Sequence, residues 1–399
     1  MLKLTIDENI AYAKDAFSRF GDVTLLHGRK ITPESLKESD VLIVRSITKV
    51  NKNLLEGSKI KFVGTATIGR DHIDLDYLRE NNITFADAAG CNAHAVKEYV
   101  FTALAGILSE KKLRFKDLSI GIIGAGNVGS KVANCANALG MKTIINDPPL
   151  KRKTGDKKYK EPDEALRADI VTLHVPLNKE GIDKTYHLLG FERLNDLKDN
   201  CILINSSRGS VVDNDALEKI IEKKNLTVIL DVWENEPELN PELLQKVFIG
   251  TPHIAGYSYE GKVNGTMMIY STLCKFLNEE ETFKAPEIKI DNAVIESDET
   301  GSVETSLQNL FGKIYDIRKD DANLRKILNK AGDENLKGSG SANNALTLKI
   351  GAGKYFDSLR KEYSLRYEFL NYTVVVPEEE KELINILSAF RFKIRTKNR

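Results

Sequence analysis

The feature that most constrains what this chain can fold into is a glycine-rich segment with the spacing G-x-G-x-x-G, formed by Gly124, Gly126 and Gly129. An apolar run, Ser119–Ile123, comes directly before it and has the composition of a buried parallel strand. A helical pattern, Val128–Leu139, opens directly after it. The spacing alone is a weak signal. With a strand before it and a helix after it, it predicts a dinucleotide-binding βαβ unit rather than an ordinary glycine-rich turn.

The acid that such a unit needs is Asp147. It follows a second apolar run, Thr143–Ile145, at about the 20-residue spacing typical of these units. Asp147 would accept hydrogen bonds from the adenosine ribose and repel a 2′-phosphate, so the sequence predicts NAD rather than NADP. The basic run at 151–153 weakens this preference. The backbone N–H groups at the helix start, around Asn127 and Val128, would bind the pyrophosphate.

The composition limits the classes of function. The chain has 399 residues, enough for two or three domains. Its 58 basic and 58 acidic residues leave no global basic field for nucleic acid. The 4 cysteines lack C-x-x-C spacing, which predicts neither a disulfide framework nor a metal site and fits a reducing cytoplasm. No apolar stretch approaches the roughly 20 residues that cross a bilayer, so we expect a cytoplasmic protein without a membrane partner.

Short apolar runs alternate with helical patterns along most of the chain. Residues 1–90 show this rhythm, which predicts a small parallel sheet covered by helices. The rhythm resumes after Asp147 and ends near Gly256, which predicts a second, doubly wound sheet. A helical pattern at Met267–Leu277 would return the chain to the first domain. The fold class is therefore α/β, with two doubly wound parallel-sheet domains.

The tail from residue 286 breaks this rhythm. We expect a helix around residues 307–315, a flexible glycine- and serine-rich loop at 338–344 and a charged helix at 355–369. A strand, a helix and a last short strand follow. These patterns predict a small α+β domain without a chemical motif, for which assembly is the default role.

Two strands of the first region end in small hydrogen-bonding side chains, Ser46 and Thr67. Ligands of open α/β sheets bind at the carboxyl ends of strands, which favours a binding role. Capping of the next helix explains the same residues equally well. The residues alone leave both interpretations open.

Three charged side chains lie just past successive strands of the second sheet: Arg208, Glu236 and His253. We expect them to face the nicotinamide end of the cofactor. The Arg208 guanidinium suits a substrate carboxylate, and His253 suits proton exchange near neutral pH. Glu236 would orient the imidazole and stabilise its protonated form. Together they predict hydride transfer at an alcohol beside a carboxylate.

A structural role must be weighed for each of these residues. A strand-end arginine is more often a surface ion pair worth about 0–1 kcal/mol. An isolated histidine after a strand is usually structural, and we read the other five that way: His27, His72, His94, His174 and His187. His253 differs because an arginine and a glutamate share its topological position.

These motifs together resemble the D-isomer-specific 2-hydroxyacid dehydrogenases. The resemblance is carried by the glycine segment, Asn205-x-x-Arg208-Gly209, Asp231…Glu236-Pro237 and Thr251-Pro252-His253-Ile254-Ala255-Gly256. It implies a substrate-binding domain from residues 1–93 with 258–285, an NAD-binding domain from residues 94–257, and a cleft between them. It also implies the catalytic roles given above for the arginine, glutamate and histidine.

The resemblance further assigns contact residues. Substrate would contact Ser46, Thr67 and Tyr257. The NAD contacts would be the glycine segment with Asn127 and Val128, together with Asp147, Val175, Ser206, Ser207, Asp231 and Gly256.

Other segments resemble one branch of this family, which oxidises a phosphorylated four-carbon sugar acid in vitamin B6 biosynthesis. Similar stretches include 44–50, 62–72, 315–321 and 356–361. The branch implies that residues 286–399 form a dimerisation domain, so we expect a homodimer. The segment 332–351 looks longer than that branch usually has.

The substrate phosphate needs cations, and Arg45 is one expectation. Arg360 or Arg366 reaching across a dimer is a second. Two other functions remain open from the sequence. One is a related family member that oxidises a phosphorylated three-carbon acid, and the other is an NAD-sensing binding protein on the same fold.

Overall fold

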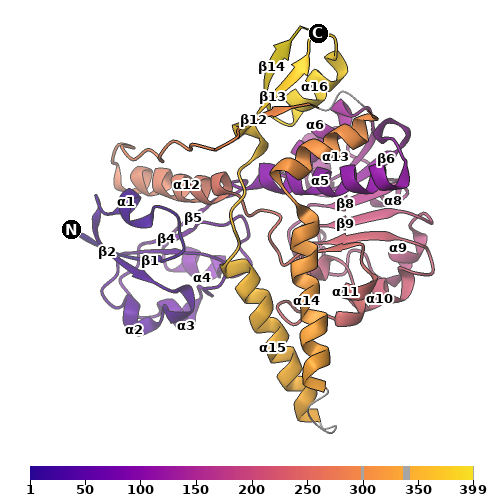
Figure 1. Cartoon of the computed structure of the whole chain (residues 1–399). Helices are drawn as coiled ribbons and strands as arrows, with labels where there is room; N and C mark the ends of the chain where they lie inside the picture. The colour runs from indigo at the N-terminus through magenta and orange to yellow at the C-terminus, as the bar shows by residue number, and fades with distance from the viewer. Residues whose placement is uncertain (298–300, 336–341, 399) are drawn as a thin grey trace. The chain divides into compact units, whose positions relative to one another are not determined.

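A computed structural model describes residues 1–297, 301–335 and 342–398, and its course is drawn in Figure 1. The chain forms two compact units, residues 1–93 with 258–290 and residues 94–257 with 291–399. Each unit is described by itself. The division into substrate, cofactor and C-terminal domains with separate roles stays a prediction.

The first unit is built on a parallel five-stranded sheet with the order β2-β1-β3-β4-β5. Its strands are β1 Leu2–Asp7, β2 Gly21–Leu26, β3 Val41–Val44, β4 Phe62–Thr65 and β5 Thr84–Asp87. Its helices are α1 Ala13–Phe17, α2 Pro33–Leu36, α3 Lys52–Leu55, α4 Leu75–Glu80 and α12 Tyr259–Leu277. Strands β3 and β4 are buried throughout, as the apolar runs predicted.

Helix α12 is longer than the pattern at Met267–Leu277 predicted. It begins at Tyr259, where the Ser258 hydroxyl accepts a hydrogen bond from the Gly261 N–H at 2.9 Å. Glycine is a poor helix former, so Gly261 and Gly265 hid the first two turns from the sequence pattern. A Cβ at Gly265 would lie 2.8 Å from the carbonyl oxygen of Ala66, so close packing on the sheet explains that glycine.

The second unit contains a parallel six-stranded sheet with the order β11-β10-β9-β8-β6-β7. Its strands are β6 Ser119–Ile123, β7 Lys142–Asn146, β8 Ile170–Leu173, β9 Ile202–Asn205, β10 Thr227–Leu230 and β11 Ile249–Gly250. The strand order reverses between β6 and β8, which is where doubly wound sheets bind their ligands. The predicted α/β class with two doubly wound parallel sheets is confirmed.

Helices connect these strands: α5 Ala93–Lys111, α6 Gly129–Ala138, α7 Pro148–Thr154, α8 Pro162–Leu166, α9 Phe191–Asp196, α10 Asn214–Ile220 and α11 Pro241–Lys246. Short 3₁₀ turns occupy η1 Gly28–Lys30, η2 Phe115–Asp117, η3 Gly209–Val211 and η4 Phe369–Asn371. Helix α5 precedes the strand before the glycine segment, and its middle is buried in the core. No helix among the described residues is long and apolar enough to span a membrane.

The C-terminal segment adds helices and a third sheet to the second unit. The helices are α13 Val303–Ile314, α14 Ile317–Asn335, α15 Ala342–Lys361 and α16 Lys381–Ala389. The parallel strands are β12 Val294–Glu296, β13 Thr373–Pro377 and β14 Lys393–Lys397. Helices α14 and α15 lie side by side (Figure 1).

The charged helix expected at 355–369 was placed wrongly. Helix α15 already starts at Ala342 and ends at Lys361, so the loop expected at 338–344 overlaps its first turn. Residues 336–341, the centre of that loop and of the long segment 332–351, lie outside the described residues. The sequence pattern ran past Lys361 because Arg366 and Phe369 are buried by tertiary contacts rather than by helix periodicity.

The C-terminal segment packs closely on the six-stranded sheet domain. Phe311, Phe369 and Phe390 belong to the same buried cluster as helix α5. Leu324 of α14 and Phe356 of α15 belong to the cluster on the other part of that sheet. This packing brings the tail beside the strands that carry the predicted catalytic residues.

Candidate active site

The glycine segment forms the turn that the sequence predicted between β6 and α6. Gly124 has a φ of 90°, a conformation that favours glycine. A Cβ at Gly129 would collide with the carbonyl oxygen of Gly124, so this glycine is needed where the helix meets the turn. A Cβ at Gly126 would meet no atom within 4 Å. The backbone at Gly126 is therefore open to an approaching ligand.

Helix α6 begins at Gly129, its N-cap residue Val128 provides no side-chain cap, and Asn127 beside Val128 is exposed. Uncapped N–H groups at a helix start, with the positive end of the helix dipole, suit a pyrophosphate. Asp147 lies at the end of β7, where one carboxylate oxygen accepts from the Ala125 N–H at 2.8 Å. The other accepts from the Leu150 N–H at 2.9 Å and caps α7. Each oxygen keeps acceptor capacity for a ribose hydroxyl.

Val175 lies beside this loop at the reversal point of the sheet. A Cβ at Gly124 would lie 2.8 Å from a methyl carbon of Val175, so the two residues face each other at the ends of neighbouring strands. This places Val175 next to the glycine turn, and its contact with NAD stays a prediction.

The turn after β9 carries Ser206, Ser207 and Arg208. Ser207 is held through its N–H and hydroxyl by the side-chain oxygen of Asn205, at 3.1 and 2.8 Å. The Ser206 hydroxyl is buried and has no hydrogen-bond partner among the described residues. An unsatisfied buried hydroxyl is costly, so this group is suited to a bound ligand. The orphaned hydroxyl, the open Gly126 and the uncapped α6 together fit a dinucleotide.

His253 and Glu236 meet at the ends of two neighbouring strands. The Nδ1 atom of His253 lies 2.5 Å from Oε1 of Glu236. Both side chains are partly exposed, at 31% and 25%. Burial alone would raise the pKa of Glu236, but the charge and hydrogen bond of His253 outweigh it and lower that pKa. The pair leaves Nε2 as the ring nitrogen for a substrate.

The backbone of His253 is in the left-handed region, with a φ of 56°. Such conformations are uncommon outside glycine and persist where the surroundings enforce them, often at functional sites. Buried Asp231 does so here. Its carbonyl accepts from the His253 N–H at 2.7 Å, and its carboxylate accepts from Ile254 and Ala255 at 2.8 and 3.0 Å. Thr251 donates to the same carboxylate at 2.7 Å.

The segment after His253 is held by the C-terminal segment. Tyr257 packs edge-on against Tyr363 with ring centroids 5.8 Å apart, and its carbonyl accepts from Arg366 at 2.8 Å. Burial works against the charged form of Arg360, but Tyr257 and Glu236 outweigh it and raise the Arg360 pKa. Gly256 is partly buried within this segment.

The expectation that Arg366 reaches across a dimer is wrong. Its side chain is 7% exposed, and its guanidinium donates to carbonyl oxygens of its own chain. Arg360 is also directed to residues of its own chain. The sequence could not show this, because main-chain carbonyls carry no residue signature.

In the first unit, Arg45 and Ser46 follow β3, and Thr67 follows β4. The Thr67 hydroxyl lies 2.9 Å from that of Thr65. Burial, and then the charge of Arg45, lowers the pKa of Lys262 in α12. The charge of Arg45 therefore acts on Lys262, and a pair of cations suits an anion. The sequence patterns did not single out Lys262. Its position one turn into a helix beginning just after Tyr257 was the available signal.

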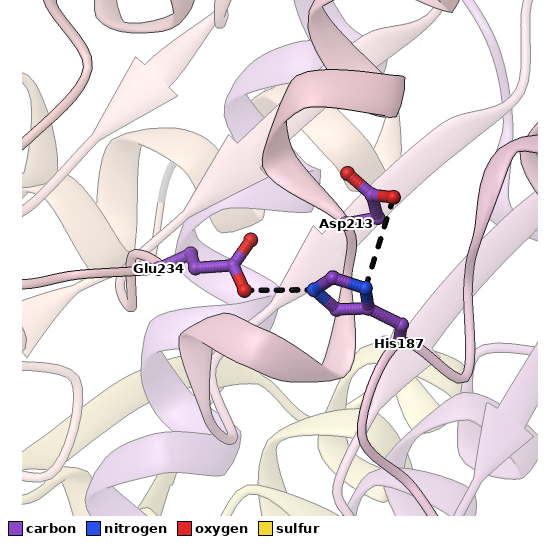
Figure 2. A group of neighbouring side chains, drawn as sticks. All are labelled: His187, Asp213 and Glu234. Carbon is purple, nitrogen blue, oxygen red and sulfur yellow. Dashed lines mark hydrogen bonds and ion pairs between the residues drawn. The ribbon is translucent and has the colours of Figure 1, made fainter.

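A second histidine–carboxylate group lies in the NAD-binding unit (Figure 2). The Nε2 atom of His187 is 2.7 Å from Glu234, and Nδ1 is 3.7 Å from Asp213. These three residues have the donor types of a metal site. However, the two ring nitrogens face different carboxylates, so a protonated imidazole satisfies the arrangement by itself. Glu234 also receives the Asn214 N–H at 3.3 Å, which ties the segment before Glu236 to α10.

The sequence of this chain is similar to known protein families and to individual enzymes. The model of the D-isomer specific 2-hydroxyacid dehydrogenase, NAD binding domain, matches residues 105–255. A model described as a domain of unknown function (DUF3410) matches residues 286–389. Erythronate-4-phosphate dehydrogenase of Escherichia coli (strain ATCC 8739) is 42% identical over 383 residues, covering 94% of each chain. The enzyme of the same name from Shigella boydii serotype 4 shows the same identity and coverage.

Solved structures agree with the fold. D-Lactate dehydrogenase from Aquifex aeolicus, complexed with NAD and lactic acid, is 26% identical with a TM-score of 0.57. The match covers 69% of this chain and 95% of that one. A second match is NAD⁺-bound 3-phosphoglycerate dehydrogenase from Entamoeba histolytica, with 24% identity and a TM-score of 0.60. The match covers 72% of this chain and 99% of that one, and it supports the fold alone.

The resemblance predicted from the motifs is confirmed, and so is NAD as the cofactor. The identity to the curated relatives extends over 94% of the chain, so it includes the C-terminal segment as well as the NAD-binding domain. The chain belongs to the erythronate-4-phosphate dehydrogenases, within the NAD-dependent D-isomer-specific 2-hydroxyacid dehydrogenase family.

Proposed function

We propose that this enzyme oxidises the C2 hydroxyl of 4-phospho-D-erythronate to give 2-oxo-3-hydroxy-4-phosphobutanoate and NADH, as a step of vitamin B6 biosynthesis. Bound NAD supplies the hydride acceptor. His253 takes the hydroxyl proton through Nε2. Glu236 holds the imidazole through Nδ1 and stabilises its protonated form. Arg208 binds the substrate carboxylate through its planar guanidinium.

The observation that carries this proposal is the His253–Glu236 hydrogen bond of 2.5 Å at the ends of adjacent strands. A histidine held by a carboxylate on one nitrogen presents the other nitrogen in a defined tautomer. Arg208 follows the next strand of the same sheet, so its carboxylate-binding group leaves the same edge. General acid–base chemistry beside an anchored carboxylate is what oxidation of a 2-hydroxy acid requires.

The cofactor contacts belong to the same proposal. Gly124, Gly126, Gly129 and the start of α6 bind the pyrophosphate, and Asp147 binds the adenosine ribose. Val175 supports the cofactor beside the glycine turn. The remaining proposed contacts are Ser206, Ser207, Asp231 and Gly256. Because the Asp231 carboxylate already binds the His253 turn, its NAD contact would use the remaining acceptor capacity.

The proposed substrate contacts follow from the resemblance and from the first unit. We assign Ser46, Thr67 and Tyr257 to the substrate, and Arg45 with Lys262 to its phosphate. The assignment is supported by the effect of the Arg45 charge on the pKa of Lys262, and by the position of Arg45 directly after β3. Replacing either with Met is expected to raise KM for the phosphorylated acid by about 10-fold or more, the loss of one charge-assisted contact of about 1.5–3 kcal/mol. KM for unphosphorylated D-erythronate is the control. An equal effect on both acids would contradict the assignment.

A substrate panel tests the reaction. NADH formation is followed with 4-phospho-D-erythronate, 3-phospho-D-glycerate and D-erythronate, with a reagent that removes the 2-oxo acid and pulls the oxidation forward. We expect the highest kcat/KM with 4-phospho-D-erythronate. A preference for 3-phospho-D-glycerate would make the protein a D-3-phosphoglycerate dehydrogenase. That alternative is not favoured, because the curated relatives match through the tail.

The same panel addresses the other class of function. Tight NAD binding without turnover of any phosphorylated hydroxy acid would indicate an NAD-sensing binding protein. We further propose a homodimer assembled through residues 286–399 and a cytoplasmic location. The location is supported by the four cysteines, which are buried and form no disulfide within the described part of the chain.

A further inference from the structure

The segment that carries His253 is hydrogen-bonded through its N–H groups and through its carbonyl groups. The carbonyl groups are bound by a residue of the C-terminal segment. Asp231 accepts from the N–H groups of His253, Ile254 and Ala255. The carbonyl side of the same segment faces Arg366, which follows α15. Its Nη2 donates to Ala255 at 2.9 Å and its Nη1 donates to Tyr257 at 2.8 Å.

Arg366 also binds the start of helix α5. Its Nη2 donates to the carbonyl of Ala95 at 2.7 Å. The chain enters this compact unit at His94 and leaves it after Tyr257. One guanidinium therefore binds the main chain beside two of the three places where the chain passes between the units, at 93/94 and 257/258.

The surroundings of Arg366 keep it charged and fixed. Its guanidinium lies 4.3 Å from the ring centroid of Tyr315, a cation–π arrangement. Burial opposes the charged form, but Tyr315, Tyr363, Glu98 and Asp320 outweigh it and hold the Arg366 pKa above its ordinary value. Asp320 in turn accepts hydrogen bonds from the two tyrosines, at 3.1 and 2.9 Å.

We propose that Arg366 is a positioning residue for catalysis, and that the tail matched as a domain of unknown function completes the active site of its own chain. Arg366 fixes the Ala255–Tyr257 carbonyls and thereby helps hold His253 in its left-handed conformation, which needs support from outside the turn. This role is separate from dimer assembly. It extends the proposed function, and its kinetic test rests on that function.

The test compares Arg366→Met with Arg325→Met. Arg325 is a matched control, because it also belongs to the C-terminal segment and donates to main-chain carbonyls. Its partners are Leu244 and Val247, at 2.7 and 2.8 Å. Its targets lie outside the His253 turn. Both variants lose a guanidinium that binds main-chain carbonyls, so both should unfold at lower temperature. Only Arg366→Met is expected to lower kcat by about 10- to 100-fold, the cost of misplacing a catalytic group by about 1 Å. NAD affinity should stay within about 2-fold in both, below the 1.4 kcal/mol of a tenfold change.

Amide hydrogen exchange gives a readout that needs no substrate. Arg366→Met is expected to speed exchange in residues 251–258, and Arg325→Met in residues 244–250. Arg366→Lys keeps the charge, but an ammonium group cannot bind three carbonyls as a planar guanidinium does. It should therefore show an intermediate loss of kcat. This variant remains informative if the Met variant does not fold. Equal kcat in both Met variants at a temperature where both are folded, with unchanged exchange at 251–258, would overturn the proposal. Failure of the proposed reaction would instead appear as missing turnover in the unsubstituted enzyme, with the exchange result unaffected.

Discussion

At the scale of single residues, two histidines share an unusual arrangement. His253 and His187 both have positive φ, 56° and 49°, and both face a glutamate, at 2.5 and 2.7 Å. They differ in what surrounds the pair. His253 follows a strand at the edge that also bears Arg208, whereas His187 lies in a connection and faces a second carboxylate. Only His253 is therefore placed for exchange of a substrate proton.

This difference makes a direct prediction. His253→Ala should lower kcat by about 10²- to 10⁴-fold, the usual contribution of general acid–base catalysis, while NAD affinity is kept. His187→Ala is the matched control and should change kcat by about 10-fold at most, since it removes one hydrogen bond of about 0.5–1.5 kcal/mol. Steady-state kinetics with calorimetric NAD titration measures both. A His187 effect as large as that of His253 would refute the assignment of the base.

The lowered pKa of Glu236 predicts how stability depends on pH. Burial opposes this shift, and the charge and hydrogen bond of His253 outweigh it. A carboxyl with a depressed pKa in the folded state contributes stability above its unfolded pKa, about 4.3. That contribution is lost as the pH falls through the folded pKa. Thermal unfolding of the enzyme and of Glu236→Gln from neutral pH downwards should show a gap in Tm above about pH 4.3 that closes at lower pH. A gap independent of pH would contradict the charge pairing.

At the scale of elements, the strands of both large sheets could be predicted closely. The apolar run predicted at Ser119–Ile123 matches the bounds of β6, because a buried strand leaves a continuous apolar stretch. The residues past β9, β10 and β11 could be predicted as a group, since the rule about strand ends depends only on topology. Helix starts were harder, as the two glycines in α12 show.

Other parts of the site had no sequence signal. The grip of Arg366 on main-chain carbonyls depends on how α15 ends and packs, which no periodicity reports. The metal-like group of His187, Asp213 and Glu234 comes from three connections that are distant in the sequence.

The βαβ element separates two kinds of glycine. Gly129→Ala should lower both Tm and NAD affinity, because its Cβ would collide with the Gly124 carbonyl. Gly126→Ala should keep Tm and still weaken NAD binding by about 10-fold or more, because its Cβ would occupy open space where the pyrophosphate approaches. Differential scanning calorimetry and NAD titration of the two variants decide this. Unchanged NAD affinity in Gly126→Ala would show that the loop does not bind the cofactor as proposed.

At the scale of the whole molecule, the C-terminal segment has two proposed duties. It packs on the NAD-binding domain through Phe311, Phe356 and Phe369, so it is part of the same compact unit. Its proposed role in assembly concerns its remaining surface. The positioning of the His253 turn and the assembly of a dimer are compatible roles, because a rigid domain serves both.

Assembly can be checked by mass. Sedimentation equilibrium is expected to give about twice the chain mass of 44.6 kDa over a wide range of protein concentration. Arg366→Met, which changes a buried residue, should leave this mass unchanged. A single-chain mass at every concentration would refute the dimer and leave the positioning role of the tail intact.

The reaction proposed for this enzyme is hydride transfer from C2 of 4-phospho-D-erythronate to NAD, with His253 as the base. The most direct measurement uses substrate carrying deuterium at C2 and mass spectrometry of the reduced cofactor. One deuterium is expected in each NADH formed. His253→Ala should form NADH with the same label, but about 10²- to 10⁴-fold more slowly. Reduced cofactor without deuterium, or no reduced cofactor from this acid while another phosphorylated acid is oxidised, would contradict it.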